Sequence, residues 1–354
     1  MASGGAGNAS NYGTFEIAGT STATQDADFL ASGINYAISS TGGADFIDLP
    51  NAADVTISGG AVGGTTQLEL KTDSALDSLS VTLDSTAAAQ TINNLDVDAD
   101  GTNTVNEVTF TTTGANGSTV TTNNVNATNV LVDGDTALDL GTLETATTNV
   151  DGRDFTGDLT VAVDATQSAV TTIRGGEGDD GITLNGAAGG DATVLAGAGD
   201  DTITVAGAQE HSVSLGDGAD TVDFNDLATA ITTGNAISTA TEFATIDGFT
   251  GGTDDIVLDN GTFGGLTAGS SLATGEYIEG TLASTSATDA QVETIASNAG
   301  VGGAQQYVAS VDIGSDVYVF YDADGHGTAG GVSLVGVLSN SDLDNVSSTD
   351  FSVA

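Results

Sequence analysis

The sequence predicts an all-β protein, a parallel β-solenoid or β-roll with short capping helices and a β-rich C-terminal segment. Three observations support this prediction. Short apolar, β-branched segments recur along the chain, turn-forming residues separate them, and an aspartate and glycine motif repeats in the second half. The 354 residues include 50 glycines and one proline, which favours a repetitive chain over two or three ordinary domains.

Charge excludes several classes of partner. The chain has 49 acidic and 3 basic side chains (Lys71, Arg153 and Arg174), and its formal net charge is -46. Such a polyanion repels nucleic acid and anionic lipid. A disordered polyanion is the simplest alternative, but the mean hydropathy is +0.08 and the apolar residues recur in order, so a folded chain is expected.

Aspartate and cysteine usage narrows the metal chemistry. There are 39 aspartates and 10 glutamates, although glutamate is the better helix former. Aspartate is typical of turns and of oxygen-rich metal loops. Cysteine is absent, which excludes disulfides and removes the usual ligands of structural zinc.

The first fifty residues are expected to form an N-terminal cap or assembly segment. Asp26–Ser39 places Leu30, Ile34 and Ile38 at helical spacing, which predicts a helix there. The preceding Met1–Gly19 is rich in small residues, and two interpretations remain open: a strand donated to the next subunit, or a disordered lead. Neither an N-terminal signal peptide nor an apolar run of 18 residues is present, so we expect neither leader-dependent export nor membrane insertion.

Residues 51–174 are predicted to be a threonine- and asparagine-rich β-solenoid. Apolar residues at positions 57, 70, 83, 97 and 110 recur about every 13 residues, and the spacing tightens to between 9 and 12 after residue 161. An antiparallel β-sandwich has similar strand spacing and stays open as the alternative. The expected strands of the repetitive part, from Val55 to Phe224, contain Val55/Ile57, Leu68/Leu70, Leu79/Val81/Leu83, Val105/Val108/Phe110, Val130/Val132, Leu159/Val161/Val163, Ile182/Leu184, Ile203/Val205 and Val222/Phe224.

Residues 175–260 are predicted to form a calcium-binding β-roll. The segment 175–183 fits the nonapeptide G-G-x-G-x-D-x-U-x, where U is a large apolar residue, and the segments 196–204 and 215–223 fit it apart from the first glycine. The residues expected to hold the metal are Gly176, Gly178, Asp180, Gly197, Gly199, Asp201, Gly216, Gly218 and Asp220.

The spacing of these copies indicates how the ions are held. Glycines let a tight turn direct carbonyl groups inward, and the aspartate adds negative charge, a donor set that suits calcium better than magnesium. Asp180, Asp201 and Asp220 are 21 and 19 residues apart, about two half-coils, so their turns should stack on one edge about 4.8 Å apart. About two ions would then lie between consecutive turns.

The turns on the opposite edge depart from the motif. They span Gly186–Asp191 and Gly207–Ser212, and Glu210 and His211 replace the expected glycine and aspartate. We therefore expect calcium on one edge only. His211 is expected to be a surface residue, because calcium takes oxygen ligands.

Residues 261–354 are expected to be a β-rich C-terminal cap. Thr288–Ser297 contains Thr288 and Gln291 at capping-box spacing, which predicts a short helix.

At this point the chain resembles the repeats-in-toxin calcium-binding family. Residues 246–249 and 252–258 are similar to the segment that follows the roll in that family, residues 317–328 to its terminal hairpin, and residues 350–354 to its C-terminal tail. The resemblance covers residues 175–354. It implies that Asp254 joins the metal-binding residues, and it implies export by type I secretion through an uncleaved C-terminal signal. More loosely, residues 50–170 resemble bacterial surface-layer proteins.

No enzyme is expected. The chain lacks H-E-x-x-H and G-x-S-x-G, and its two histidines, His211 and His326, lie in glycine- and aspartate-rich turns that favour exposed loops. A G-x-G-x-x-G match at residues 176–181 contains adjacent aspartates, which would repel a pyrophosphate. Paired carboxylates for glycoside cleavage stay open.

The leading functional hypothesis is an extracellular, calcium-dependent structural protein that self-assembles into a surface layer or filament. Its partner would be a further copy of itself, and a cell-surface glycan or lipopolysaccharide stays open as the anchor. The chain has one lysine and one proline, the residues that natural proteins use to protect sheet edges. The alternative is a monomeric adhesin or ligand-binding module, including an ice-binding solenoid with rows of threonine.

Overall fold

The computed structural model describes residues 13–20, 24–30, 34–100, 103–121, 123–169, 171–186, 190–207, 209–225, 229–230, 243–269, 271–273, 275–283, 288–303, 305–327 and 331–354. The chain forms two compact units, Met1–Ala162 and Val163–Ala354. Each unit is built mainly of strands in two sheets. Among the described residues, no helix is long and apolar enough to cross a membrane.

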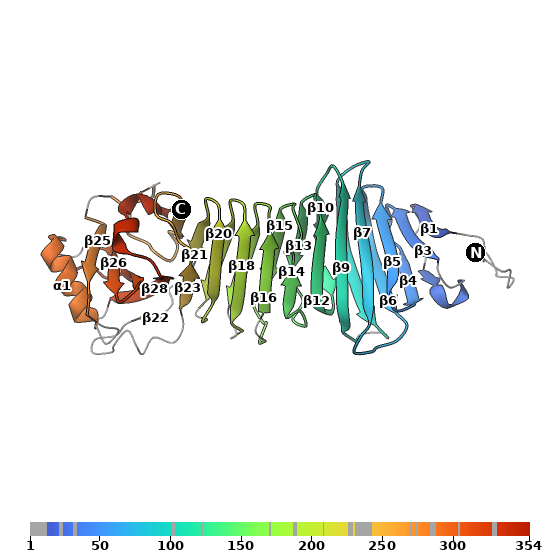
Figure 1. Cartoon of the computed structure of the whole chain (residues 1–354), viewed down its shortest axis with the longest axis horizontal. Coiled ribbons are helices and arrows are strands. Elements are labelled where there is room, and N and C mark those ends of the chain that lie inside the picture. The colour runs from blue at the N-terminus through green and yellow to red at the C-terminus, as the bar shows by residue number, and fades with distance from the viewer. Residues whose placement is uncertain are drawn as a thin grey trace. The chain divides into compact units, whose positions relative to one another are not determined.

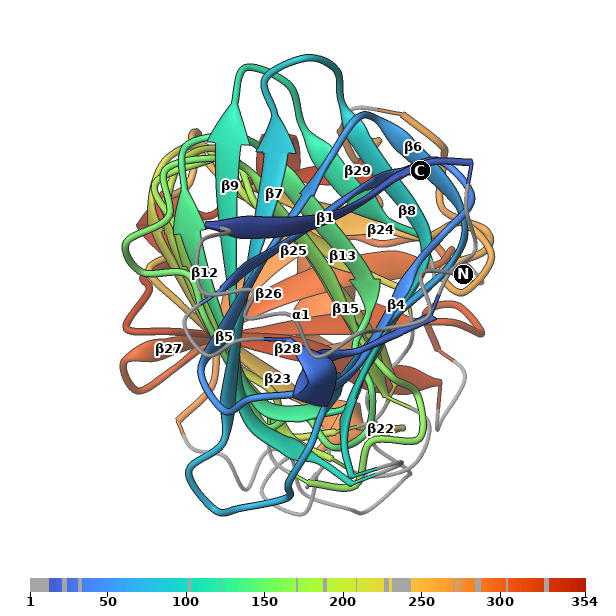
Figure 2. The ribbon, with the colours of Figure 1, turned by 90° about the vertical axis from the view of Figure 1, so that its right-hand side faces the viewer.

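The first unit is all-β, parallel and solenoid-like, since successive strands, apart from β10 and β11, alternate between two sheets (Figure 1). Figure 2 shows β7 and β9 of the first sheet on one side of the stack and β6 and β8 of the second on the other. In spatial order, the first sheet holds β1 (Thr14–Gly19), β3 (Asn35–Ser40), β5 (Ala53–Ser58), β7 (Ser78–Ser85), β9 (Val105–Gly114), β12 (Ala127–Gly134) and β14 (Asn149–Asp151). The second holds β2 (Thr24–Asp26), β4 (Asp45–Leu49), β6 (Ala61–Leu70), β8 (Gln90–Ala99), β10 (Ser118–Val120), β13 (Leu138–Thr142) and β15 (Leu159–Val163), with β11 (Asn123–Val125) also beside β8.

The core of this unit consists of apolar columns that run across the coils. Alternation places every second side chain inside, as in β7, and parallel pairing sets equivalent residues side by side. Ile57 of β5 lies between Ile38 and Leu83 of its neighbours, and all three are fully buried. Because the named strand pairs here are parallel, the pairing is not that of the antiparallel sandwich.

The expected helix at Asp26–Ser39 is wrong. The segment contains the end of β2, a single 3-10 turn at Ala27–Phe29 and strand β3. Ile34, Tyr36 and Ile38 are buried, so the apolar residues follow a period of two. Pairing of β3 with both β1 and β5 satisfies the backbone and overrides the helical spacing.

Only the last part of the Met1–Gly19 segment lies within the described residues. Thr14–Gly19 forms β1, which pairs in parallel with β3 of its own chain. Residues 1–12 lie outside the described residues.

The second unit begins with the same alternating, parallel pattern. Its first sheet contains β16 (Thr171–Gly176), β18 (Ala192–Ala198), β20 (Ser212–Asp217) and β23 (Ala244–Asp247). Its second sheet contains β17 (Gly181–Gly186), β19 (Thr202–Gly207), β21 (Thr221–Phe224), β24 (Asp255–Leu258) and, from the end of the chain, β29 (Phe351–Val353). Ile182, Ile203, Val222, Ile256 and Phe351 form one buried column across that sheet.

The C-terminal part changes to antiparallel pairing. β28 (Val332–Ser339) continues the first sheet beside β23, and β27 (Asp316–Asp322) and β26 (Tyr307–Ile313) follow it as antiparallel neighbours. β25 (Tyr277–Thr281) ends the sheet, while the two-residue β22 (Thr229–Ala230) also pairs with β28. The 3-10 turns Leu343–Asn345 and Ser348–Asp350 precede β29.

The expected helix at Thr288–Ser297 is confirmed as α1 (Asp289–Ala299). Thr288 and Gln291 form the capping box, and Gly300 ends the helix in a left-handed conformation with φ 80°. Val292 and Ala296 pack into an apolar cluster with residues of β25 to β28.

Candidate functional site

The three repeated turns meet on one edge of the second unit, as their spacing predicts. They connect β16 to β17, β18 to β19, and β20 to β21. The parallel register sets Gly176 beside Gly197, and Gly197 beside Gly216. Equivalent positions of successive turns are therefore stacked, one strand spacing apart.

The glycines of the motif are required by this stacking. Gly197 and Gly216 have φ of 129° and 118°, which L side chains rarely adopt. A Cβ on Gly197 would lie 2.2 Å from the carbonyl oxygen of Gly176, and a Cβ on Gly216 would lie 1.9 Å from that of Gly197. The fourth position is equally tight, because a Cβ on Gly218 would lie 1.8 Å from the Gly199 oxygen. Each turn therefore presents carbonyl oxygens to the next.

The motif aspartates form a buried ladder. Their exposed fractions are between 1% and 2%. The backbone N–H of Asp180 donates to Oδ1 of Asp201 at 2.7 Å, and the N–H of Asp201 donates to Oδ1 of Asp220 at 2.9 Å. The N–H of Asp220 then donates to Oδ1 of Asp254 at 3.0 Å, so Asp254 is the next member of the ladder.

The second carboxylate oxygen, Oδ2, is hydrogen-bonded at the two ends of the ladder but not in its middle. Oδ2 of Asp180 accepts from the N–H of Gly176 at 2.9 Å, and Oδ2 of Asp254 accepts from the N–H of Thr250 at 2.6 Å. In contrast, Oδ2 of Asp201 and Oδ2 of Asp220 are buried and have no hydrogen-bond partner. Two buried oxygens in adjacent turns thus lack a donor, an arrangement that costs free energy unless a proton or a cation satisfies them.

Electrostatics in the ladder disfavour the ionised form. Burial raises the pKa of Asp201 to about 7, and the negative charges of Asp180 and Asp220 add to the effect, although the Asp180 N–H opposes it. Burial also raises the pKa of Asp220, and the charges of Asp254 and Asp200 contribute. A cation bound here would reverse both effects.

The opposite edge differs from the sequence-based expectation. His211 is 3% exposed, so its expected surface position is wrong. Its Nδ1 accepts from the N–H of Ala192 at 3.1 Å, and burial lowers its pKa, with the charge of Asp191 opposing. The imidazole ring of His211 is therefore neutral and lies in the interior of the second unit. Residues 187–189 and 208 of these turns lie outside the described residues.

His326 is half-buried, although its neighbours Ala323, Asp324 and Gly327 are exposed. Its side chain is 15% exposed, and its Nδ1 lies 2.8 Å from Oε2 of Glu293 on α1. The loop between β27 and β28 therefore packs against α1 at His326.

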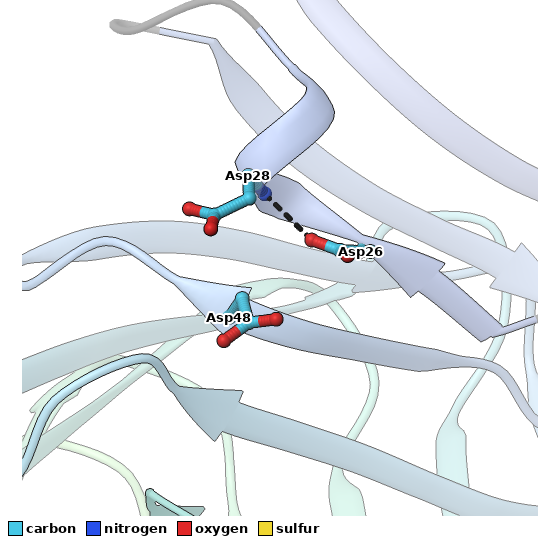
Figure 3. A group of neighbouring side chains, drawn as sticks. All are labelled: Asp26, Asp28 and Asp48. Atoms are coloured by element: carbon cyan, nitrogen blue, oxygen red, sulfur yellow. Dashed lines mark hydrogen bonds between the residues drawn. The ribbon is translucent and has the colours of Figure 1, made fainter. Parts of the chain in front are cut away.

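A further acidic group in the first unit was not predicted from the sequence. Asp26, Asp28 and Asp48 offer carboxylate oxygens within 4.8 Å of one another and could hold a metal ion (Figure 3). Oδ1 of Asp26 accepts from the N–H of Asp28 at 2.9 Å, and Lys71 forms an ion pair with Asp28. Pairing of β2 with β4 brings Asp48 to the other two, and only the D-x-D spacing was visible in the sequence.

Comparison with known protein families, with curated proteins and with solved structures finds no match for this chain.

Proposed function

We propose that this chain is a secreted structural protein whose repeats-in-toxin-like β-roll binds calcium and which then self-assembles at a cell surface or in an extracellular matrix. One observation carries the proposal: the unpartnered, buried Oδ2 atoms of Asp201 and Asp220 occur in adjacent turns of the repeated motif.

The donor chemistry of these turns favours calcium. Asp201 and Asp220 supply anionic oxygens, and the stacked glycines supply carbonyl oxygens from neighbouring turns. Calcium accepts six to eight oxygen ligands in flexible geometry, whereas magnesium requires a strict octahedron and retains water. Asp201 and Asp220 would hold the ion, and Asp180 and Asp254 would position the turns on either side.

Calcium would couple folding to the extracellular environment. The net charge of -46 opposes a compact state wherever calcium is scarce. An ion at ten times its dissociation constant adds about 1.4 kcal/mol to the folded state, so the two ions expected between consecutive turns would contribute roughly 3 kcal/mol. That contribution is a large share of the usual stability of a domain, about 5 to 15 kcal/mol.

The strands at the ends of the sheets are the basis for the proposed self-assembly. Within the described residues, β1 and β2 are terminal strands of the two sheets of the first unit, and β25 is terminal in the second unit. A terminal strand presents unpaired N–H and C=O groups that can pair with another chain. Acidic repulsion would keep such ends apart until calcium neutralises it. A cell-surface glycan or lipopolysaccharide is the proposed anchor.

The test is a calcium titration of chelator-treated protein. Wild-type protein should gain several degrees in melting temperature, and Asp201→Asn and Asp220→Asn should each lose most of that gain. Asp217→Asn is the matched control, because Asp217 is exposed in the same turn as Asp220 and should leave the response unchanged. An equal gain in all four proteins would contradict calcium binding at the ladder.

Electron microscopy of the same samples tests assembly. Ordered sheets or filaments that form only with calcium support the structural role. A calcium-loaded protein that stays monomeric at high concentration and binds glycans would instead support the adhesin.

A further inference from the structure

A second group of titratable side chains lies where α1 meets the end of β27, in the second unit. Glu293 of α1 is its centre. Its Oε1 accepts from the hydroxyl of Tyr307 on β26 at 2.9 Å, and its Oε2 accepts from the N–H of Gly327 at 2.8 Å. The same Oε2 lies 2.8 Å from Nδ1 of His326. One side chain therefore links the helix to a strand and to the loop that follows β27.

Asp322 faces Glu293 from the end of β27. The residue is fully buried, and its Oδ1 accepts from the N–H groups of Asp324 at 3.1 Å and Gly325 at 2.9 Å. Its Oδ2 is buried and receives no hydrogen from any donor. The carboxyl group of Glu293 lies within hydrogen-bonding reach of Asp322. Two carboxylates at that distance repel strongly unless one is protonated or a cation lies between them.

The surroundings offer little positive charge. Residues 175–354 contain no lysine or arginine. Near the pair, the titratable groups are Asp289 on α1, Tyr307 on β26, and Asp324 and His326 in the loop. Among the described residues around the pair, His326 is the one basic side chain, and it contacts Glu293.

Burial is the main cause that raises the pKa of Asp322 to about 7, and contacts with Glu293 and Asp324 raise it further, although the Gly325 N–H opposes them. Asp322 therefore holds a proton in conditions where a solvated carboxyl group, with a pKa of about 3.9, has lost it.

We propose that Asp322 and Glu293 share one proton, and that this proton fastens α1 to the C-terminal sheet as a pH-sensitive latch. The docked state holds a proton that the undocked state releases. The latch is thus fully closed in acid and weakens as the pH rises through about 7. This inference is independent of calcium binding at the ladder.

Hydrogen exchange of the α1 amides tests the latch. Exchange is measured on the full chain in chelator at pH 5.5 and pH 8.5 and corrected for intrinsic rates. Wild-type protection should fall about tenfold to thirtyfold between the two pH values. Asp322→Asn should show little change, because its amide donates to Glu293 at every pH as the protonated acid does. Asp324→Asn, an exposed neighbour, is the control and should retain most of the wild-type fall.

Protection that is equal at both pH values in wild type, or a full fall in Asp322→Asn, would overturn the latch. A carbon NMR titration of the Asp322 carboxyl group in wild type needs no variant and should give an apparent pKa near 7. A value near 4 would also overturn it. Recovery of protection at pH 8.5 by millimolar calcium in Asp201→Asn, whose ladder should no longer respond to the ion, would show that a cation closes the pair, and would replace the proton mechanism.

Discussion

Replacement of Asp201 by asparagine should stabilise the ion-free protein while removing its response to calcium. Asp201 is 1% exposed, and its Oδ2 has no hydrogen-bond partner. Burial raises its pKa to about 7, above the value of about 3.9 for an unfolded aspartate. The native state therefore binds a proton more tightly than the unfolded state does.

The sign of the pH dependence follows from this difference. The favourable contribution of protonated Asp201 is fully present below about pH 4 and is lost as the pH rises through about 7. Three pKa units correspond to on the order of 4 kcal/mol, which is an upper limit at pH 8. The asparagine side chain of Asp201→Asn would keep an oxygen for the Asp180 N–H. It would carry no charge, so the free-energy cost of burying an ionised carboxylate would be removed.

Urea unfolding in chelator at pH 5, 6, 7 and 8 measures the effect. Wild type should lose stability across this range, and Asp201→Asn should be more stable than wild type at pH 8 by roughly 2 to 4 kcal/mol. With millimolar calcium the order should reverse. If Asp201→Asn were less stable than wild type at pH 8 in chelator, the buried Oδ2 of Asp201 would not be the source of the pH dependence.

Three further predictions concern the fold. Ile57→Ala should lower the free energy of unfolding by about 2 to 5 kcal/mol in urea titrations, because Ile57 is fully buried in a column, whereas the outward Thr56→Ala should change it by less than about 1 kcal/mol. Gly216→Ala should be markedly more destabilising than Gly252→Ala in the same assay, since both have positive φ but only the first would place a Cβ 1.9 Å from a carbonyl oxygen. The lowered pKa of His211 predicts a loss of stability as the pH falls below about 6.5, which His211→Gln should reduce in acid unfolding curves.

The strand pattern and the turn motif were readable from the sequence because both are local. Alternation of apolar residues specifies which side of a strand is buried, as in Leu79, Val81 and Leu83 of β7. The capping box of Thr288 and Gln291 likewise depends on four consecutive residues. The 21- and 19-residue spacing of the motif aspartates predicted that they lie on one edge, because a regular coil returns to the same edge after each turn.

Long-range packing selected between two local patterns and set the contacts between distant segments. Ile34 and Ile38 fit a helix and a strand equally well, and pairing with β1 and β5 selected the strand. Asp48 joins Asp26 and Asp28 only through the pairing of β2 with β4, and Asp322 meets Glu293 only because α1 packs on the C-terminal sheet. Sequence periodicity records which side of a strand is buried, but long-range packing alone determines which side chains become neighbours and which carboxyl oxygens are left without a donor.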